Sequence, residues 1–243
     1  MRDQKRPAFA GLVLLVFLVL FGAVFTALGV WQLHRRTWKL DLMEAVDRRV
    51  HAPAVLTPGP KQWPQVSYDH DLYRHVVVHG RYMNDDETYV HATSELGMGF
   101  WVLTPFRSDR GFTVLVNRGF VPYDRRLPSR RKEGMITGET SVTGLLRLSE
   151  PKGAFLRDNK PDEDVWYSRD VRAIAQKRKL NVIRTAPYFI DADGGLVQGG
   201  WPRGGLTVIS FPNNHLVYAL TWFALALLCV VGAGTVLAKR GVD

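Results

Sequence analysis

Two long uncharged stretches dominate the pattern of apolar and polar positions, one near each end of the chain. They cover residues 8–33 and residues 215–238. A helix rises about 1.5 Å per residue, so about 20 residues cross the roughly 30 Å hydrocarbon core of a bilayer. Both stretches exceed that length, whereas charged residues occur throughout the part between them. The pattern predicts two membrane-spanning helices that anchor a polar domain formed by residues 34–214.

A cleaved signal peptide is the alternative for the first stretch. The apolar part of a signal peptide is about 7–15 residues long and ends in small residues. This stretch is longer, and it ends in Trp31 and Gln32, followed by His34 and Arg35. Aromatic and basic residues suit a membrane interface better, so we expect an anchor. The start of the chain also lacks an Arg- and Ser-rich transit peptide, which favours a bacterial plasma membrane.

Basic residues flank both predicted spans on their terminal sides: Arg2, Lys5, Arg6, Lys239 and Arg240. The positive-inside rule then predicts that the tails at residues 1–7 and 239–243 are cytoplasmic and that residues 34–214 are periplasmic. Arg35, Arg36 and Lys39 follow the first span and argue for the opposite orientation. They carry less weight because long loops cross the membrane largely regardless of their charge.

The middle of the chain has mainly strand character. Residues 34–50 continue the first helix by their apolar spacing, and prolines at 53, 58, 60 and 64 then indicate a linker. One soluble helix is expected at residues 170–180, with Asp170 as its cap. The spacing of the strands predicts a mainly antiparallel sheet (α+β), closed as a barrel or packed as a sandwich. The expected strands cover residues 73–83, 87–94, 98–106, 112–121, 141–148 and 187–191.

Composition narrows the classes of partner. The net charge of +9 is spread along the chain, with no dense basic block interleaved with aromatic residues, so nucleic acid is not an expected partner. Anionic lipid headgroups or an acidic protein suit this charge better. The single cysteine, Cys229, lies in the second span, so the middle domain has no disulfide and depends on its own core.

Motifs of common enzymes are absent: the sequence has no P-loop, CxxC, HExxH or GxSxG pattern. We therefore expect no catalytic residues. His75 and His79 could share a face of a strand, but at about 13 Å they would be too far apart to bind one metal ion. Together with His70 and His91 they are expected on the surface or on a sheet face.

Two histidines lie at the edges of the predicted spans, His34 and His215. A neutral imidazole is a good axial ligand for heme iron. Tyr218 and Trp222 follow His215 by three and seven residues, on one side of a helix, and could form an aromatic wall beside a porphyrin. The alternative is that both rings belong to an interfacial aromatic belt and that His215 only caps the helix.

Three segments, in order along the chain, resemble the surfeit locus protein 1 family. The first holds Trp31-Gln32, Arg35, Trp38 and Lys39. The second, the most specific, centres on Val116-Asn117-Arg118-Gly119-Phe120-Val121-Pro122, where the family usually has Trp in place of Phe120. The third is Asn213-Asn214-His215-Leu216-Val217-Tyr218-Ala219-Leu220-Thr221-Trp222-Phe223.

The resemblance implies an assembly factor for cytochrome c oxidase, not an enzyme. It implies transient binding of heme a and help with its insertion into subunit I, with His215 as the candidate ligand of the heme iron. Trp222 and Tyr218 would lie beside the heme, and a heme a synthase could supply it. The alternatives are a scaffold that stabilises subunit I without binding heme, or a permanent oxidase-associated subunit.

Arg118, in the second segment, has two interpretations. Its guanidinium could hold a carboxylate such as a heme propionate through two hydrogen bonds. It could equally bind backbone carbonyls at a corner of the sheet, where Gly119 would allow a bend. The second, structural interpretation is the one we favour.

Overall fold

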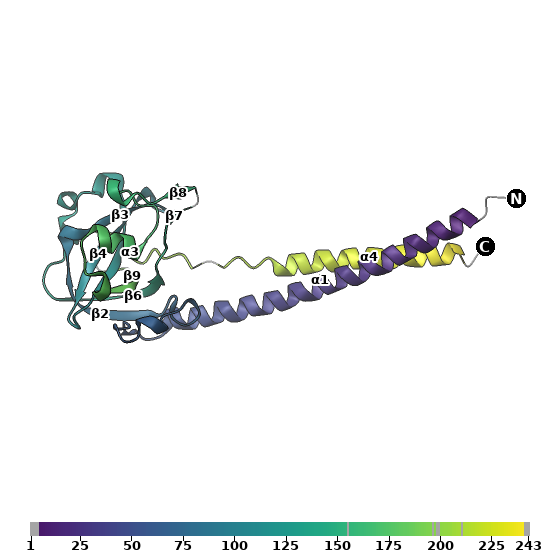
Figure 1. Cartoon of the computed structure of the whole chain (residues 1–243), viewed down its shortest axis with the longest axis horizontal. Helices are drawn as coiled ribbons and strands as arrows, with labels where there is room; N and C mark the ends of the chain where they lie inside the picture. The colour runs from purple at the N-terminus through teal and green to yellow at the C-terminus, as the bar shows by residue number, and fades with distance from the viewer. Residues whose placement is uncertain (1–4, 155, 196, 198–199, 210, 241–243) are drawn as a thin grey trace. The chain divides into compact units, whose positions relative to one another are not determined.

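The computed structural model describes residues 5–154, 156–195, 197, 200–209 and 211–240 (Figure 1). The chain divides into two compact units. One unit contains the described residues up to Ala45 and from residue 211 onward, and the other runs from Val46 to Ile209. Part of each predicted tail, residues 1–4 and 241–243, lies outside the described residues.

The first unit consists mainly of two long helices, of which α1 continues for its last residues into the second unit. Helix α1 runs from Lys5 to His51 without a break and is about 70 Å long, so the predicted helical extension beyond the first apolar stretch is confirmed. Helix α4 runs from His215 to Arg240. Within them, Phe9–His51 and His215–Lys239 are long and apolar enough to cross a membrane.

A five-stranded barrel forms the centre of the second unit. The barrel strands follow the order β2-β6-β9-β5-β4, and β2 also pairs with β4, which closes the sheet. A barrel is therefore the form that the sheet takes, and not a sandwich. At the margins of the sheet, the two-residue strand β1 pairs with β2 and the seven-residue strand β3 pairs with β4, and β7 and β8 form a separate pair. The strands are β1 Val55–Leu56, β2 His75–Tyr82, β3 Thr88–Ser94, β4 Gly97–Ser108, β5 Thr113–Pro122, β6 Thr140–Leu148, β7 Gly153–Ala154, β8 Arg157–Asp158 and β9 Thr185–Ala192.

The barrel is mainly antiparallel, as predicted, but the pairing of β5 with β9 is parallel. Four antiparallel pairings connect β9 to β5 the other way round, through β6, β2 and β4. Strand directions cannot alternate around a closed ring with an odd number of strands, so at least one pair must be parallel. The chain reaches β9 from β6 through a long crossover that contains helix α3, Val171–Lys177.

Two hydrophobic layers hold this unit together. Alternate residues of all five barrel strands, such as Val76, Val116 and Ile190, form the interior cluster. Residues of opposite parity, such as Leu115 and Phe189, face outward and pack with α3. Asp170 caps α3 by accepting a hydrogen bond from the backbone N–H of Ala173, as predicted.

Short helices connect these elements and contribute no further layer. One is α2, Tyr68–Asp71. The others are single 3₁₀ turns: η1 Trp63–Gln65, η2 Asn84–Asp86, η3 Tyr123–Arg125, η4 Pro128–Arg130, η5 Lys132–Gly134, η6 Pro161–Glu163 and η7 Val182–Arg184.

Candidate functional site

Helix α4 packs against α1 along one seam of residues. Ala219, Ala226 and Cys229 are buried there, and His215 and Trp222 are half-buried. Successive positions in this set are four, three, four and three residues apart, which is the spacing of a helix packed lengthwise on another helix. The seam therefore begins at His215, the first residue of α4.

His215 contacts α1 through Gln32. The Nδ1 atom of the imidazole lies 2.7 Å from Oε1 of the Gln32 side chain. An amide oxygen can only accept a hydrogen bond, so Nδ1 carries the proton and donates it. In the neutral imidazole the lone pair then lies on Nε2, and no described residue forms a hydrogen bond with that atom.

Aromatic rings occupy the next two turns of the seam. Trp222 lies about 10 Å along the axis from His215 and stacks on Phe25 of α1, with ring centroids 5.6 Å apart and planes 23° from parallel. Phe223 fits against Gly29, where an added Cβ atom would lie 2.5 Å from the phenylalanine ring. Gly29 therefore allows the two helices to approach each other at this level.

The other two predicted residues lie elsewhere. Tyr218 is 55 % exposed, at the rim of the seam. His34 is exposed as well; it follows Gln32 by two residues, so it points about 160° away from the side of α1 that contacts His215. The described residues thus bring one histidine, not two, into the helix pair.

The residues present fit a heme with a single protein ligand. Nε2 of His215 has no hydrogen-bond partner among the described residues, and Phe25 and Trp222 bring an aromatic ring from each helix into the seam. Oδ1 of Asn213, two residues before His215, is buried and has no hydrogen-bond partner among the described residues. An orphaned acceptor of this kind is uncommon in a folded protein and is available to a bound group.

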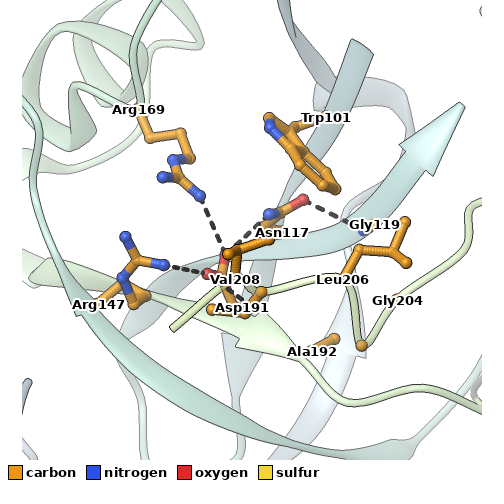
Figure 2. A pocket seen from close by; sticks show the side chains of 12 residues that line it. Trp101, Asn117, Gly119, Arg147, Arg169, Asp191, Ala192, Gly204, Leu206 and Val208 are labelled. Atoms are coloured by element: carbon orange, nitrogen blue, oxygen red, sulfur yellow. Dashed lines mark hydrogen bonds and ion pairs between the residues drawn. The ribbon is translucent and has the colours of Figure 1, made fainter. Parts of the chain in front are cut away.

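A separate cavity of about 200 Å³ lies on the outer wall of the barrel, and Asp191 of β9 is at its centre (Figure 2). Arg147 of β6 and Asn117 of β5 each donate to this carboxylate at 2.8 Å. Thr207 donates at 3.1 Å and Arg169 at 3.4 Å. Figure 2 shows both guanidinium groups directed toward Asp191.

The charges around this cavity are already compensated. Arg169 also binds Glu150 through two hydrogen bonds of 2.6 and 2.9 Å, so two arginines face two carboxylates. Burial lowers the pKa of Arg169, but Asp191 and Glu150 outweigh burial and raise it. The network therefore ties residues 203–208, which lead toward α4, to the barrel, and offers no free charge to a ligand. No local sequence pattern indicates this network, because its members come from five separate segments.

Arg118 is buried inside the folded unit. Its side chain is 1 % exposed and pairs with Glu87, which also pairs with Arg131. Arg118 further donates to the backbone oxygen of Gly134. The structural interpretation of Arg118 is thus confirmed. Arg131 lies in the basic, turn-rich segment between β5 and β6, and its side chain is fully buried as well.

His75 of β2 connects the segment that follows α1 with the segment that follows β9. Its Nδ1 lies 2.9 Å from the backbone oxygen of Ala52, and its Nε2 lies 2.9 Å from Oδ2 of Asp193. Both partners are acceptors, so the charged imidazolium, with two N–H groups, satisfies both contacts. Burial lowers the pKa of His75, but the hydrogen bonds to Asp193 and Ala52 outweigh it and raise the pKa above its ordinary value of 6.5.

Among the described residues, no cluster of His, Cys, Asp or Glu could hold a metal ion.

The stability of the barrel unit is therefore expected to fall as the pH rises through the pKa of folded His75. A raised pKa contributes stability that is fully present below about pH 6.5 and is lost above the folded value. Unfolding midpoints of the full chain in detergent, measured from pH 5.5 to 9, should show this decrease, and His75→Gln should abolish it. His79→Gln is the control, because the His79 imidazole hydrogen-bonds a neutral group, the Ser141 hydroxyl. An unchanged pH profile in His75→Gln would contradict the assignment.

Comparisons with known proteins give one consistent result. The model of the SURF1 family matches residues 19–227. The chain is similar to Surfeit locus protein 1 of Rattus norvegicus, at 35 % identity over 226 residues that cover 86 % of this chain and 71 % of the relative. It is similar to the Homo sapiens protein of the same name, at 35 % identity over 86 % and 72 %. A SURF1-like protein of Monosiga brevicollis is 34 % identical over 83 % and 78 %.

Proposed function

The chain belongs to the SURF1 family, and on this premise we propose that it is a membrane-anchored assembly factor for cytochrome c oxidase. In this proposal it binds heme a transiently at His215 and assists the insertion of that heme into subunit I. The observation that carries the proposal is the contact between His215 and Gln32, in which Nδ1 faces the amide oxygen and Nε2 has no hydrogen-bond partner among the described residues.

The proposed location follows from the two apolar helices. Both would cross a bacterial plasma membrane, with the two ends of the chain in the cytoplasm and residues 34–214 in the periplasm. Basic residues such as Lys239 support this orientation. In it, His215 would lie at the outer edge of the bilayer, where a membrane-bound heme a synthase could deliver heme and subunit I could receive it.

The residues of the seam have different proposed roles. When bound, heme a would supply an iron atom that an imidazole nitrogen can ligate. His215 would provide that nitrogen, Gln32 would hold the ring, and Trp222 and Tyr218 would give the porphyrin apolar contact. A single protein ligand suits a carrier, because a carrier must also release its cargo. We assign no catalytic step to the chain.

His215→Ala is expected to remove heme a from the protein. The full chain would be co-expressed with the enzymes of heme a synthesis and purified in detergent, and its visible spectrum recorded. The wild type should show a Soret band, His215→Ala should lose it, and His34→Ala, an exposed histidine on the other helix, should retain it. Circular dichroism would verify that the helices still form.

One outcome would contradict the heme-binding role, and another would contradict the transient role. Wild type without a Soret band, together with His215→Ala that still supports oxidase assembly, would favour a scaffold that stabilises subunit I. Stoichiometric recovery of the chain in the mature oxidase would favour a permanent subunit over a transient factor.

A further inference from the structure

The contact between Gln32 and His215 determines more than the position of the ring. Both side chains are half-buried between two helices, where a hydrogen bond competes less with water than at the surface. The 2.7 Å distance is short for a neutral N–H···O bond. A free neutral imidazole exchanges between two forms, with the proton on either nitrogen, but only the form with the proton on Nδ1 satisfies Gln32.

We infer that Gln32 is a positioning residue, which selects the His215 tautomer whose Nε2 can bind iron and fixes the direction in which that atom points. The inference rests on the proposed heme-binding role and adds to it the residue that prepares the ligand. Histidines that bind metals in proteins usually donate their other N–H to an acceptor of this kind, and loss of the acceptor typically lowers metal affinity 10- to 100-fold.

The Gln32 side chain is uncharged, which suits a site that must release the heme it binds. A carboxylate at this position would draw the Nδ1 proton toward itself, make Nε2 more basic and strengthen the bond to iron. An amide oxygen orients the ring equally well and strengthens that bond less. A carboxylate in the helix pair would also be costly where an apolar helix lies within the membrane.

The opposite orientation of the amide has a distinct consequence. If the NH₂ group of Gln32 faced Nδ1, it would donate to that nitrogen and leave the proton on Nε2. His215 could not bind iron in that form. The two orientations therefore predict opposite tautomers, and the tautomer can be measured without heme.

The first test uses the full chain without heme, labelled with ¹⁵N-histidine, in detergent micelles. The ¹⁵N shifts of His215 should show the proton on Nδ1 in the wild type and a shift toward the Nε2-protonated form in Gln32→Leu. His34 is the internal reference, because it is exposed and lies on another side of α1. A wild-type His215 with its proton on Nε2 would overturn the inference.

The second test compares heme a occupancy and reduction potential in the co-expressed proteins. Gln32→Leu should bind heme a 10- to 100-fold more weakly than the wild type. Gln32→Glu keeps an acceptor of similar length, so it should restore binding, lower the reduction potential of the bound heme and slow its transfer to an acceptor protein. A residue that only packs the helices would give neither the rescue nor the shift in potential.

The outcomes separate this inference from the proposed function. Wild type that never binds heme refutes the carrier role, whereas the tautomer measurement still tests what Gln32 does to His215. Wild type that binds heme, with Gln32→Leu equal to it in affinity and potential, overturns the inference alone.

Discussion

Replacement of Glu87 with leucine is expected to destabilise the barrel unit by about 3–5 kcal/mol, because it leaves two buried guanidinium groups without a counter-ion. The Glu87 side chain is 3 % exposed, and its partners Arg118 and Arg131 are 1 % and 0 % exposed. A domain is typically stable by only about 5–15 kcal/mol, so a loss of this size approaches unfolding. The signature segment that contains Arg118 would lose its anchor.

Comparing the stability losses of three variants gives a sharper test than Glu87→Leu alone. Arg131→Met leaves a one-to-one pair of Arg118 and Glu87 and should cost less than Glu87→Leu. Glu163→Leu is the matched control, since this carboxylate is 62 % exposed and forms a surface ion pair with Lys160. Urea unfolding of the full chain in detergent would measure the three losses. Equal losses in Glu87→Leu and Glu163→Leu would contradict the role of the buried cluster.

Gly119→Ala is expected to detach residues 203–208 from the barrel and to cost about 3 kcal/mol, from backbone strain and lost hydrogen bonds. Gly119 has a φ angle of +123°, and an added Cβ atom would lie 2.0 Å from the backbone oxygen of Arg203. At this point Phe120 and Arg203 exchange two backbone hydrogen bonds, of 2.9 and 3.0 Å. A displaced Arg203 would also weaken the bond from Thr207 to Asp191.

Gly97→Ala separates steric collision from backbone strain. Gly97 also has a positive φ angle, +100°, but nothing lies within 4 Å of an added Cβ atom. This control should cost only about 1 kcal/mol. Limited proteolysis should cut Gly119→Ala within residues 203–208 much faster than either Gly97→Ala or the wild type. Similar cleavage rates in both variants would mean that Arg203 moves aside without loss.

The local pattern of residues in the sequence was sufficient to predict the main strands and the soluble helix. The strands found at His75–Tyr82 and Thr140–Leu148 lie within two residues of the ranges expected from β-branched residues and alternation. Asp170 caps its helix as the pattern of a helix start indicates. Barrel closure was not predictable in this way, because it depends on the pairing of β2 with β4, and alternation within one strand carries no information about its partner.

For the candidate site, sequence identified His215 and Trp222 but not their partners. Gln32 and Phe25 lie on the other helix, and which of its side chains face α4 depends on how the two helices pack. The 4–3 spacing of Ala219, Trp222 and Ala226 was the available signal, and it places Tyr218 at the rim. Likewise, nothing near Arg118 in the sequence indicates that its buried guanidinium pairs with Glu87, 31 residues away.

The sequence by itself determined the two apolar helices, the strands between them and the histidine at the start of α4, because each depends on residues a few positions apart. Tertiary structure alone decided that five strands close with one parallel pair, that Arg118 is buried and that Gln32 meets His215. Arg118 and Glu87 are 31 positions apart and Gln32 and His215 are 183 positions apart, and only the packed chain brings such residues within hydrogen-bonding distance.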